Sequence, residues 1–425
     1  MRIIDTKRLD DGKGFNQGQD SRLIMIESPA DFDQLQENIL TTDYYGKQYF
    51  ATRISHEAET IKAANLLVAA MARLLRPRSV LELGCGRGDI LLLLSLAGVD
   101  EVAGIDISAE VVGSMWPRLA DKVHLGDLLD FCPAFARQGK LFDTVVALDI
   151  WEHLHPARLD DYIRAVIQAS TADALFYFNI PAFGPDRAFG EAFPLEYEEN
   201  RRDFEAGRPF SFLLADSVDP PIPVNGHLIW ASSGWWEEQF ARQGLTRAIE
   251  LEKRLHELFD DHLFYAQRAF FIFHRAQAPT ARLSAIASAN MDQTAKAGQL
   301  KDLLLAVNSF EDSYGKPVLD AHKTLMDLNH SLDLVRGQPR RRAELLVPLV
   351  KFLRRDERYR HGEALVYFEQ KLDHDLHLIQ DDLYTRAGEM AARWPLPPGR
   401  GLRLRLWRGL ARRRFERYQK ALLSS

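Results

Sequence analysis

Short apolar runs alternate with helical patterns from residue 56 to residue 274. The runs have the length and composition of buried parallel strands, and they predict strands at 80–83, 102–105, near 123, and at 142–149, 174–180, 245–251 and 267–274. Helical patterns lie around and between them, at 56–75, 90–96, 109–116, 128–138, 157–170 and 234–243. This alternation predicts an α/β fold with a doubly wound, mostly parallel sheet of seven strands.

Other patterns occupy the rest of the chain. Residues 1–40 are polar and dotted with glycine, which predicts a loosely ordered N-terminal arm. Residues 181–234 form a long insertion rich in Pro, Phe and acids, and its aromatic content favours a lid or an acceptor platform. Residues 276–298 have the composition of a linker. Helical patterns at 300–310, 318–335, 342–352 and 363–393 then predict an all-α domain or an oligomerisation stalk over 299–399.

The last segment, residues 400–425, combines basic charge with an apolar stripe. It contains eight Arg and Lys420 against one acid, Glu416. Apolar residues recur every three or four positions, at Trp407, Ala411, Phe415, Tyr418 and Leu422. A basic amphipathic helix of this kind is typical of peripheral membrane contact. The alternative is a tail that docks on the acidic body of its own chain or of a partner.

Composition narrows the class of protein. A chain of 425 residues has room for two domains, and 46% hydrophobic with 27% charged residues is ordinary for a globular protein. The net charge of −6 predicts no general affinity for nucleic acid. The N-terminus lacks the apolar core of a signal peptide, and the only two cysteines are Cys85 and Cys132. These features favour a reducing cytoplasm.

A glycine-rich turn follows the first buried strand. Gly84, Gly86 and Gly88 have the spacing Gly-x-Gly-x-Gly, whereas a dinucleotide site would need its third glycine at the position of Asp89. Glycines let the backbone approach a ligand, and the helix that follows offers free N–H groups. Glu82 would repel a pyrophosphate, but it can hold a ligand ammonium through water. An acidic glycine turn therefore indicates a nucleoside that carries an amino acid.

Further acids follow the next strands. Asp106 ends the second strand, 22 positions after Gly84, where a carboxylate can accept both hydroxyls of a ribose. Gly126 and Asp127 follow the third strand, where an acid can bond an adenine amino group. The fourth strand, at 142–149, leads directly into Ile-Trp-Glu-His.

These motifs, in this order and spacing, resemble those of the class I S-adenosylmethionine-dependent methyltransferases. The resemblance covers residues 41–275 and implies a final antiparallel edge hairpin and S-adenosylmethionine as cofactor. In a tyrosine-rich segment at 43–53, Arg53 would pair with the cofactor carboxylate; alternatively, these aromatics only fasten a helix to the sheet. The implied cofactor-binding residues are Arg53, Glu82, Gly84, Cys85, Gly86, Gly88, Asp106, Ile107, Gly126, Asp127, Leu128 and Leu148.

Catalytic candidates lie after the fourth strand and at the end of the insertion. A hydroxyl acceptor needs a base or a metal, and His153, His155 and His227 are the base candidates. Asp149-x-x-Glu152-His153 resembles the Glu-x-x-Glu-His signature of metal-assisted quinone-ring O-methyltransferases, and it implies a divalent metal, with Mn²⁺ or Zn²⁺ suited better than Mg²⁺. A purely structural turn is the alternative. Farther on, Asp373, His374, Asp375 and His377 have helical spacing for a metal, but a solvated charged face is the preferred interpretation.

The function that we predict is methylation of a hydroxyl on a glycan or lipid-linked sugar, as in polysaccharide biosynthesis. Histidines and carboxylates crowd the expected site, and no Asn/Asp-Pro-Pro-Phe/Tyr signature follows the fourth strand. One alternative is a quinone or lipid-precursor O-methyltransferase, and another is a non-catalytic interaction protein that keeps the cofactor fold. The predicted partners are a small-molecule or glycan acceptor, the inner membrane face through 400–425, and a second copy through the helical region. Nucleic acid is not among them.

Overall fold

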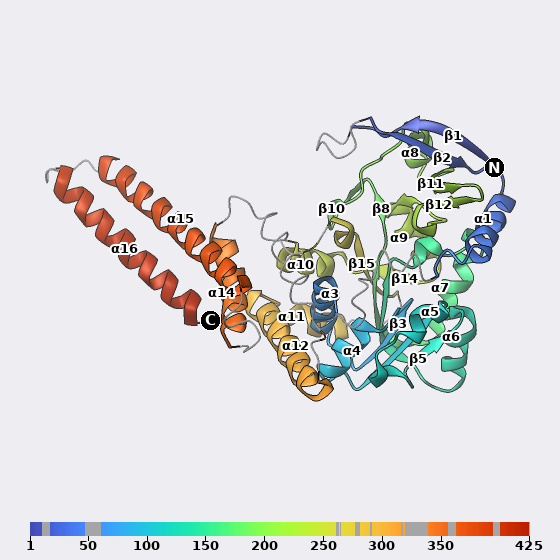
Figure 1. The fold of residues 1–425 in the computed structure, drawn as a ribbon, viewed down its shortest axis with the longest axis horizontal. Coiled ribbons are helices and arrows are strands. Elements are labelled where there is room, and N and C mark those ends of the chain that lie inside the picture. The colour runs from blue at the N-terminus through green and yellow to red at the C-terminus, as the bar shows by residue number, and fades with distance from the viewer. Residues whose placement is uncertain are drawn as a thin grey trace. The chain divides into compact units, whose positions relative to one another are not determined.

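The computed structural model describes residues 1–10, 18–46, 61–260, 263, 265–276, 281–289, 291–315, 318, 339–355, 363–393 and 400–424. The chain forms two compact units, Met1–Asp320 and Ala321–Ser425 (Figure 1). The first unit is an α/β domain and the second is helical.

A seven-stranded sheet forms the centre of the first unit, in the order β14-β15-β7-β6-β3-β4-β5. Its strands are β3 (Ser79–Leu83), β4 (Glu101–Asp106), β5 (Val123–Leu125), β6 (Phe142–Leu148), β7 (Ser170–Asn179), β14 (Leu245–Arg247) and β15 (Phe270–Arg275). All neighbouring pairs are parallel except the two that involve β15. The predicted doubly wound, mostly parallel sheet is confirmed.

The last two strands pair antiparallel at the edge of the sheet, as predicted: β14 is the edge strand, and β15 lies between β14 and β7 and is antiparallel to both. The connection between them differs from the prediction, because it is a helix and not a tight turn. Helix α10 (Ile249–Phe259) occupies the second half of the predicted strand at 245–251 and connects β14 to β15. The charged sequence of α10 places Leu251, Leu255 and Leu258 on one buried side, a spacing that suits a helix.

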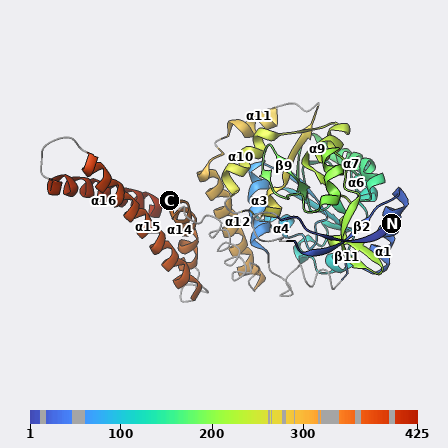
Figure 2. The same ribbon diagram turned by 90° about the horizontal axis from the view of Figure 1, so that it is seen from above.

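Helices cover both faces of the sheet (Figure 2). Successive residues of a strand point to opposite faces, so Leu81 and Leu83 contribute to one apolar core and Val80 to the other. The first core includes α6 (Leu128–Arg137), α7 (Leu159–Gln168) and α9 (Ser233–Arg242). The second includes α3 (Ala63–Leu74), α4 (Asp89–Leu96), α10 and α12 (Gln293–Tyr314). The short helix α5 (Ala109–Gly113) follows β4.

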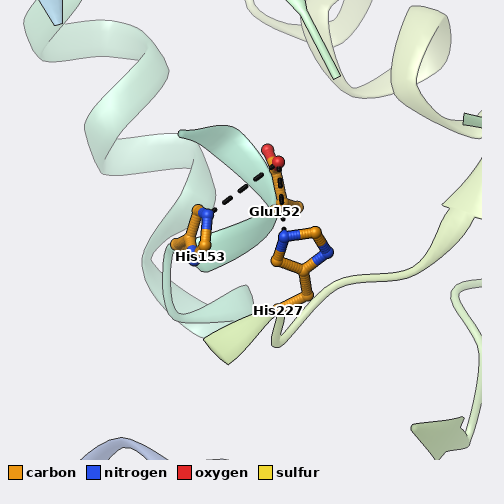
Figure 3. A group of neighbouring side chains, drawn as sticks. All are labelled: Glu152, His153 and His227. Carbon is orange, nitrogen blue, oxygen red and sulfur yellow. Dashed lines mark ion pairs between the residues drawn. The ribbon is translucent and has the colours of Figure 1, made fainter. Parts of the chain in front are cut away.

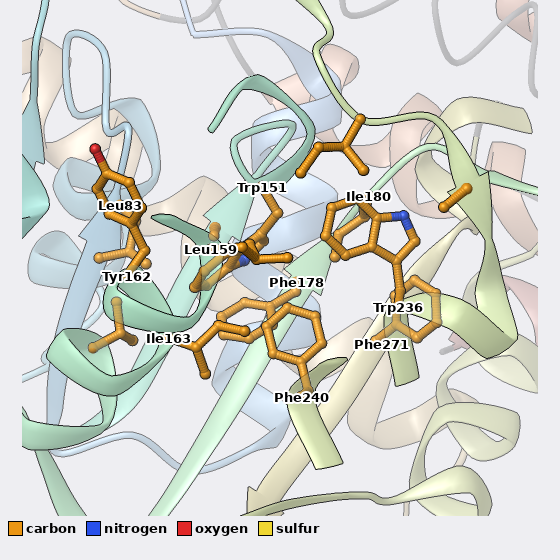
Figure 4. Close-up of a cluster of buried hydrophobic side chains, with 14 of the residues drawn as sticks. Leu83, Trp151, Leu159, Tyr162, Ile163, Phe178, Ile180, Trp236, Phe240 and Phe271 are labelled. Carbon is orange, nitrogen blue, oxygen red and sulfur yellow. The ribbon is translucent and has the colours of Figure 1, made fainter. Parts of the chain in front are cut away.

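Aromatic side chains fill the first core (Figure 4). The rings of Trp151, Phe178 and Phe240 lie with their centroids 4.9–5.1 Å apart, within the range of favourable aromatic pairs. Trp151 follows β6, Phe178 belongs to β7, and Phe240 belongs to α9. The turn after β6 is therefore anchored in the core by its first residue.

The first unit continues past residue 275, which corrects the predicted linker at 276–298 and the helical domain at 299–399. Helix α4 is buried on every side from Ile90 to Leu94, so its outer surface needs a cover. Helix α12 supplies that cover by packing on α3 and α4. Helix α11 (Ala281–Ser288) is fastened through Arg282, which donates to the Leu75 carbonyl and the Thr144 hydroxyl.

The described part of the N-terminal segment, residues 1–10 and 18–40, forms strands and a helix, contrary to the loosely ordered arm predicted for residues 1–40. A second sheet has the order β1-β2-β11-β12. Its strands are β1 (Arg2–Lys7), β2 (Asp20–Met25), β11 (Phe212–Val218) and β12 (Pro221–Pro223), and α1 (Pro29–Thr41) follows β2. Leu23 and Ile24 are fully buried and pair with Leu214 and Leu213 of the insertion, which explains the order.

The rest of the insertion packs into short elements. These are β8 (Ala182–Phe183), β9 (Pro185–Asp186), β10 (Gly190–Glu191), α8 (Arg201–Glu205) and β13 (Ala231–Ser232). Strand β8 pairs with β13, and the stacked rings of Phe183 and Trp230 are both buried beside this pair. Many of the insertion's aromatic residues thus form an extension of the core.

The second unit contains α14 (Pro339–Arg355), α15 (Glu363–Arg393) and α16 (Arg400–Ser424). Ala411 and Phe415 of the tail are each 8% exposed and belong to the core of this unit, and the Tyr418 hydroxyl donates to the Arg340 carbonyl. The described part of the apolar stripe therefore packs on the chain's own helices. The side chains of Trp407 and Leu422 lie outside the described residues, and so does the predicted helix at 318–335 apart from Val318.

The charged group on α15 has the arrangement of a solvated face. Asp373, His374 and His377 are exposed, whereas Asp375 is buried and accepts a hydrogen bond from Arg342 Nε at 3.0 Å. Among the described residues, no helix is long and apolar enough to cross a membrane.

A conservative change in the tail tests its packing. Phe415→Leu is expected to lower the stability of the helical unit by about 1 kcal/mol, because a buried ring is replaced by a smaller side chain. Leu410→Ala, at a side chain that is 44% exposed, should cost less than about 0.5 kcal/mol. Urea unfolding of the full-length chain, followed by helical circular dichroism, measures both. Equal stability of the two variants would contradict the burial of Phe415.

Candidate active site

The glycine turn lies between β3 and α4, as the sequence predicts. Gly84, Gly86 and Gly88 have φ angles of 63°, 55° and 78°, in the left-handed region that favours glycine. A Cβ on Gly84 would lie 1.9 Å from Ile150 Cδ1, and one on Gly88 would lie 2.5 Å from Leu119 Cδ1. The backbone conformation therefore favours glycine at all three positions, and a Cβ at Gly84 or Gly88 would also force a neighbouring side chain to move.

Asp106, the last residue of β4, holds the glycine turn in place. Its Oδ2 accepts a hydrogen bond from the Gly86 N–H at 2.8 Å, and its Oδ1 accepts one from the Ser108 N–H at 2.9 Å. Burial raises the pKa of Asp106. The next side chain, Ile107, is 63% exposed and offers an apolar surface beside the carboxylate. This pairing of an acid with an apolar surface suits a nucleoside, whose hydroxyls donate and whose base is flat.

Glu82 is a buried acid under the same turn. Its Oε2 has no hydrogen-bond partner, and burial raises its pKa well above the ordinary value, with Asp89 and Asp106 adding to the effect. Nearby Asp89 is satisfied differently, because Trp116 Nε1 and Asn65 Nδ2 donate to it at 2.7 and 2.9 Å. A buried unpartnered oxygen is costly, so a ligand that brings a donor or a positive charge to Glu82 would be stabilised.

The residues around Asp127 are engaged within the protein. Asp127 caps α6 by accepting from the Leu129 N–H at 2.8 Å, and its other oxygen accepts from the Tyr162 hydroxyl at 3.0 Å. Gly126 is required there, since a Cβ would lie 2.7 Å from the Phe131 ring. Tyr162 is a partner that sequence reasoning missed.

The other predicted cofactor residues are apolar, with one exception. Cys85 and Leu128 are buried, and Leu148 is half-buried at the end of β6. Arg53 lies outside the described residues. The described candidates thus line the carboxyl ends of β3, β4, β5 and β6. Successive strands are added in one direction from β3 to β5 and in the other direction from β6, so the strand order reverses between β3 and β6. Ligands of doubly wound sheets bind at such a reversal.

A second group, of one acid and two imidazoles, lies after β6 (Figure 3). Glu152 Oε1 is 3.9 Å from His153 Nε2 and 3.8 Å from His227 Nε2, and one ligand atom of each residue lies within 4.8 Å of the others. The two imidazole rings are perpendicular, with centroids 4.7 Å apart. We call Glu152, His153 and His227 the Glu–His–His group.

Backbone hydrogen bonds bring the group together. The turn η2 (Trp151–His153) carries Glu152 and His153, and its carbonyl at Glu152 accepts from the N–H groups of Leu228 and Ile229 at 2.8 and 3.0 Å. His227 immediately precedes these two residues and follows the turn η5 (Val224–Gly226). The insertion is therefore fastened to the turn after β6 where the imidazoles meet the acid.

Glu152 is the electrostatic centre of this group. Its side chain is 0% exposed, and neither carboxylate oxygen has a hydrogen-bond partner. Burial, followed by the charge of Asp149, raises the pKa of Glu152 well above its ordinary value. Asp149 has a left-handed φ of 52° at the end of the strand. The predicted metal ligands were Asp149, Glu152 and His153. Among the described residues, the group that could hold a metal is Glu152, His153 and His227.

Tyr45 supports His153 from the other side. Its hydroxyl lies 2.9 Å from His153 Nδ1 and 3.3 Å from the Gly226 carbonyl, to which it donates. Tyr44 donates to Asp216 at 2.7 Å. Both tyrosines belong to the segment 43–53 that was predicted to cover the cofactor, and both contact the insertion. The Tyr45 carbonyl also accepts from the Ser108 hydroxyl at 3.4 Å, next to Asp106. The sequence showed the tyrosine cluster, but it did not show that Tyr45 contacts His153.

His155 has a structural position. Its Nδ1 accepts from the Ala157 N–H at 3.2 Å and so caps the turn η3 (Pro156–Arg158). Its Nε2 lies 3.2 Å from Asp33 Oδ1 on α1. Nδ1 is thus used to hold the chain in place, whereas Nε2 makes no hydrogen bond. The capping role of Nδ1 favours His153 and His227 over His155 as the base.

The role of Asp106 is testable by ligand binding. Asp106→Ala is expected to weaken S-adenosylhomocysteine binding by at least about 1.5 kcal/mol, because the nucleoside loses a charged acceptor and the Gly86 N–H loses its partner. Glu101→Ala, at the opposite end of β4, is the matched control and should keep wild-type affinity. Isothermal titration calorimetry measures both. Unchanged affinity in Asp106→Ala would remove this residue from the ligand site.

Part of the chain matches a known protein family. Residues 54–246 match the family model of a methyltransferase domain. A 1,6-didemethyltoxoflavin methyltransferase from Burkholderia thailandensis is similar at 13% identity over 63% of this chain and 97% of that chain, with a TM-score of 0.35. An amino pentose methyltransferase from Micromonospora echinaspora is similar at 16% identity over 54% and 98%, with a TM-score of 0.34. No curated protein matches the chain significantly.

Proposed function

We propose that this chain, which carries a methyltransferase domain over residues 54–246, transfers the methyl group of S-adenosylmethionine to a hydroxyl. Three features support the choice of donor. The glycine turn allows close approach of a ligand, the unpartnered oxygen of Glu82 suits its ammonium, and Asp106 suits its ribose. The sulfonium supplies the activated methyl group, so the protein's task is to align donor and acceptor.

The observation that carries the choice of acceptor is the buried Glu–His–His group. In the transfer, the bond from methyl carbon to sulfur breaks, its electron pair stays on sulfur, and the acceptor oxygen bonds to the methyl carbon. The hydroxyl proton must leave at the same time, and an imidazole Nε2 of His153 or His227 accepts it. The Glu152 carboxylate, 3.8–3.9 Å from both nitrogens, stabilises the resulting imidazolium.

The acceptor class that we propose is a glycan or lipid-linked sugar. Polar groups at the carboxyl end of β6 suit a substrate with several hydroxyls, whereas the aromatic rings of Phe183 and Trp230 are buried in the insertion's core. The rival acceptor is a quinone or other lipid precursor. The third possibility, an interaction protein that keeps the fold without catalysis, predicts no binding of the methyl donor.

Transfer of radiolabelled methyl groups distinguishes these cases. The protein is incubated with labelled S-adenosylmethionine and with separate cell fractions of glycans, lipid-linked sugars and quinone precursors. We expect alkali-stable label in one of the two sugar fractions, and O-methyl sugars after hydrolysis. Label in the quinone fraction favours the rival acceptor. Absence of donor binding in calorimetry would overturn the methyltransferase proposal itself.

Variants of the two histidines test the base. His153→Ala and His227→Ala should keep donor affinity within about twofold, and the variant that lacks the base should lose about 100-fold or more in turnover. His155→Ala is the matched control and should retain turnover. Full turnover in both His153→Ala and His227→Ala would exclude an imidazole base.

A cytoplasmic location with peripheral membrane contact is also part of the proposal. Both cysteines, Cys85 and Cys132, are buried free thiols. The described side chains of α16 include six exposed cations: Arg408, Arg412, Arg413, Arg414, Arg417 and Lys420. Because Phe415 is buried in its own unit, contact with an anionic membrane would rest on charge, at about 1 kcal/mol per cation before screening. Flotation with anionic vesicles at low but not high salt is expected.

The helical unit is the proposed site of self-association. Helix α15 exposes four large apolar side chains to solvent: Val366, Tyr367, Leu378 and Met390. Light scattering of the full-length chain measures its oligomeric state, and a monomer at all concentrations would contradict this part.

A further inference from the structure

A buried carboxylate without a hydrogen-bond partner is an unusual feature of a folded protein. Both oxygens of Glu152 lack a partner, although the side chain is fully buried. Leaving such a group unsatisfied costs roughly 1–3 kcal/mol or more. Two imidazole nitrogens face it at 3.8 and 3.9 Å, too far for direct hydrogen bonds. Glu152 Oε1 thus lies near Nε2 of both imidazoles without a direct hydrogen bond to either.

We propose that Glu152, His153 and His227 bind one divalent transition-metal ion of the Zn²⁺ or Mn²⁺ type. Ligand atoms at about 2.0–2.2 Å from a tetrahedral ion lie roughly 3.3–3.6 Å from one another. The two distances from Glu152 Oε1 to the imidazole Nε2 atoms are only a few tenths of an ångström longer, and one ligand atom of each histidine lies within 4.8 Å of the other, so side-chain rotation closes the site. The third ligand, His227, comes from the insertion, 75 positions after Glu152.

The donor set indicates which ions fit. Two imidazoles and one carboxylate favour Zn²⁺, Mn²⁺ or Fe²⁺, whereas Mg²⁺ and Ca²⁺ prefer oxygen ligands. Three protein ligands also leave at least one coordination position for water or a substrate oxygen, as catalytic zinc sites do. The group therefore has the composition of a reactive site and differs from closed structural zinc sites, which have four protein ligands.

Tyr45 is the positioning residue of this site. When its hydroxyl donates to the Gly226 carbonyl, its oxygen accepts from the Nδ1–H of His153 at 2.9 Å. This tautomer leaves the lone pair of His153 on Nε2, the nitrogen that faces Glu152. Histidines that bind metals are commonly oriented by such a partner on the other ring nitrogen. A Cβ at Gly226 would lie 2.1 Å from the Tyr45 oxygen, so glycine there makes room for the hydroxyl.

The inference concerns ion binding, and its link to catalysis rests on the proposed function. A bound ion would occupy the Nε2 lone pairs of His153 and His227, so in the ion-bound form its Lewis acidity, which lowers the pKa of an acceptor hydroxyl, takes the place of the imidazole base. The two proposals fail separately. A protein that binds the ion but transfers no methyl group contradicts the proposed function alone. One that transfers methyl groups but binds no ion contradicts the ion site alone.

Metal titration of the chelator-treated, full-length protein tests the site. Calorimetry with Zn²⁺ and Mn²⁺ should show one saturable site per chain, and Mg²⁺ should bind at least 100-fold more weakly. With Co²⁺, the visible absorption should have the intensity of a site with fewer than six ligands. Affinity for S-adenosylhomocysteine, measured in chelator, should stay within about threefold and shows that the protein is folded.

Variants decide which residues hold the ion. Glu152→Gln and His227→Ala should each weaken Zn²⁺ binding by at least 100-fold and abolish the Co²⁺ absorption, and Tyr45→Phe should weaken binding by about tenfold. The control variant, His374→Ala with His377→Ala, removes two exposed histidines of the helical unit and should keep the site. Loss of binding in this control, unchanged binding in His227→Ala, or no saturable binding in the wild type would overturn the proposal.

Discussion

Replacing Arg247 with methionine is expected to lower the free energy of unfolding of the first unit by about 3–5 kcal/mol. The Arg247 side chain is 1% exposed and donates to Asp186 at 2.7 and 2.8 Å and to Glu252 at 2.7 Å. Both acids are themselves buried, so methionine would leave two carboxylates in an apolar surrounding without their cation. The guanidinium also lies 4.5 Å from the centre of the Phe271 ring.

Arg187 provides the matched control. Its side chain is 61% exposed and pairs with Glu237, which Arg247 also contacts. Arg187→Met should therefore cost less than about 1 kcal/mol, because exposed ion pairs contribute little. Tryptophan fluorescence during urea unfolding follows the first unit, where five of the seven tryptophans lie. Similar losses in the two variants would show that the Arg247 cluster is not the anchor we describe.

The Arg247 cluster illustrates what a sequence hides. Asp186 belongs to the insertion, Arg247 to β14 and Glu252 to α10, and nothing in their local patterns marks them as partners. From the sequence, Glu252 would be taken as exposed, because its neighbours Glu250, Lys253 and Arg254 are charged. Only the packing of three segments shows that these charges are inside. The same holds for the Glu–His–His group, where backbone hydrogen bonds to Glu152 bring His227 into place.

The central sheet was predictable because its strands are buried on both faces. Such strands form nearly continuous apolar runs, and β6 is buried from Phe142 to Ala147. Its two polar residues, Asp143 and Thr144, accept hydrogen bonds from arginine side chains. The strands of the second sheet are short and half-exposed, and β2 finds its partner β11 almost 190 residues later in the chain. Local patterns carry little information on such pairs. The cover over α4 was foreseeable, since five consecutive buried residues from Ile90 to Leu94 require apolar surroundings on all sides.

Gly84→Ala is expected to have the largest effect on the active site. Its φ of 63° is strained for alanine, by about 1–2 kcal/mol, and the new Cβ would lie 1.9 Å from Ile150 Cδ1 and 2.6 Å from its Cγ1. Either the glycine turn or Ile150 must move, which adds about 1–3 kcal/mol. Ile150 directly precedes the turn η2, which carries Glu152 and His153. One methyl group thus disturbs both the donor site and the Glu–His–His group.

We therefore expect Gly84→Ala to lower affinity for S-adenosylhomocysteine by at least about 30-fold, or about 2 kcal/mol, and to lower stability as well. Gly98→Ala is the matched control, because Gly98 has a φ of 87° but no heavy atom within 4 Å of a built Cβ. It carries the same backbone strain at the far end of α4, so it should lose stability while keeping full affinity. Calorimetry measures affinity and urea unfolding measures stability. Applied to both variants, they separate the effect of backbone strain from that of the steric clash with Ile150. If the two variants bind equally well, the contact between Gly84 and Ile150 does not link the two groups.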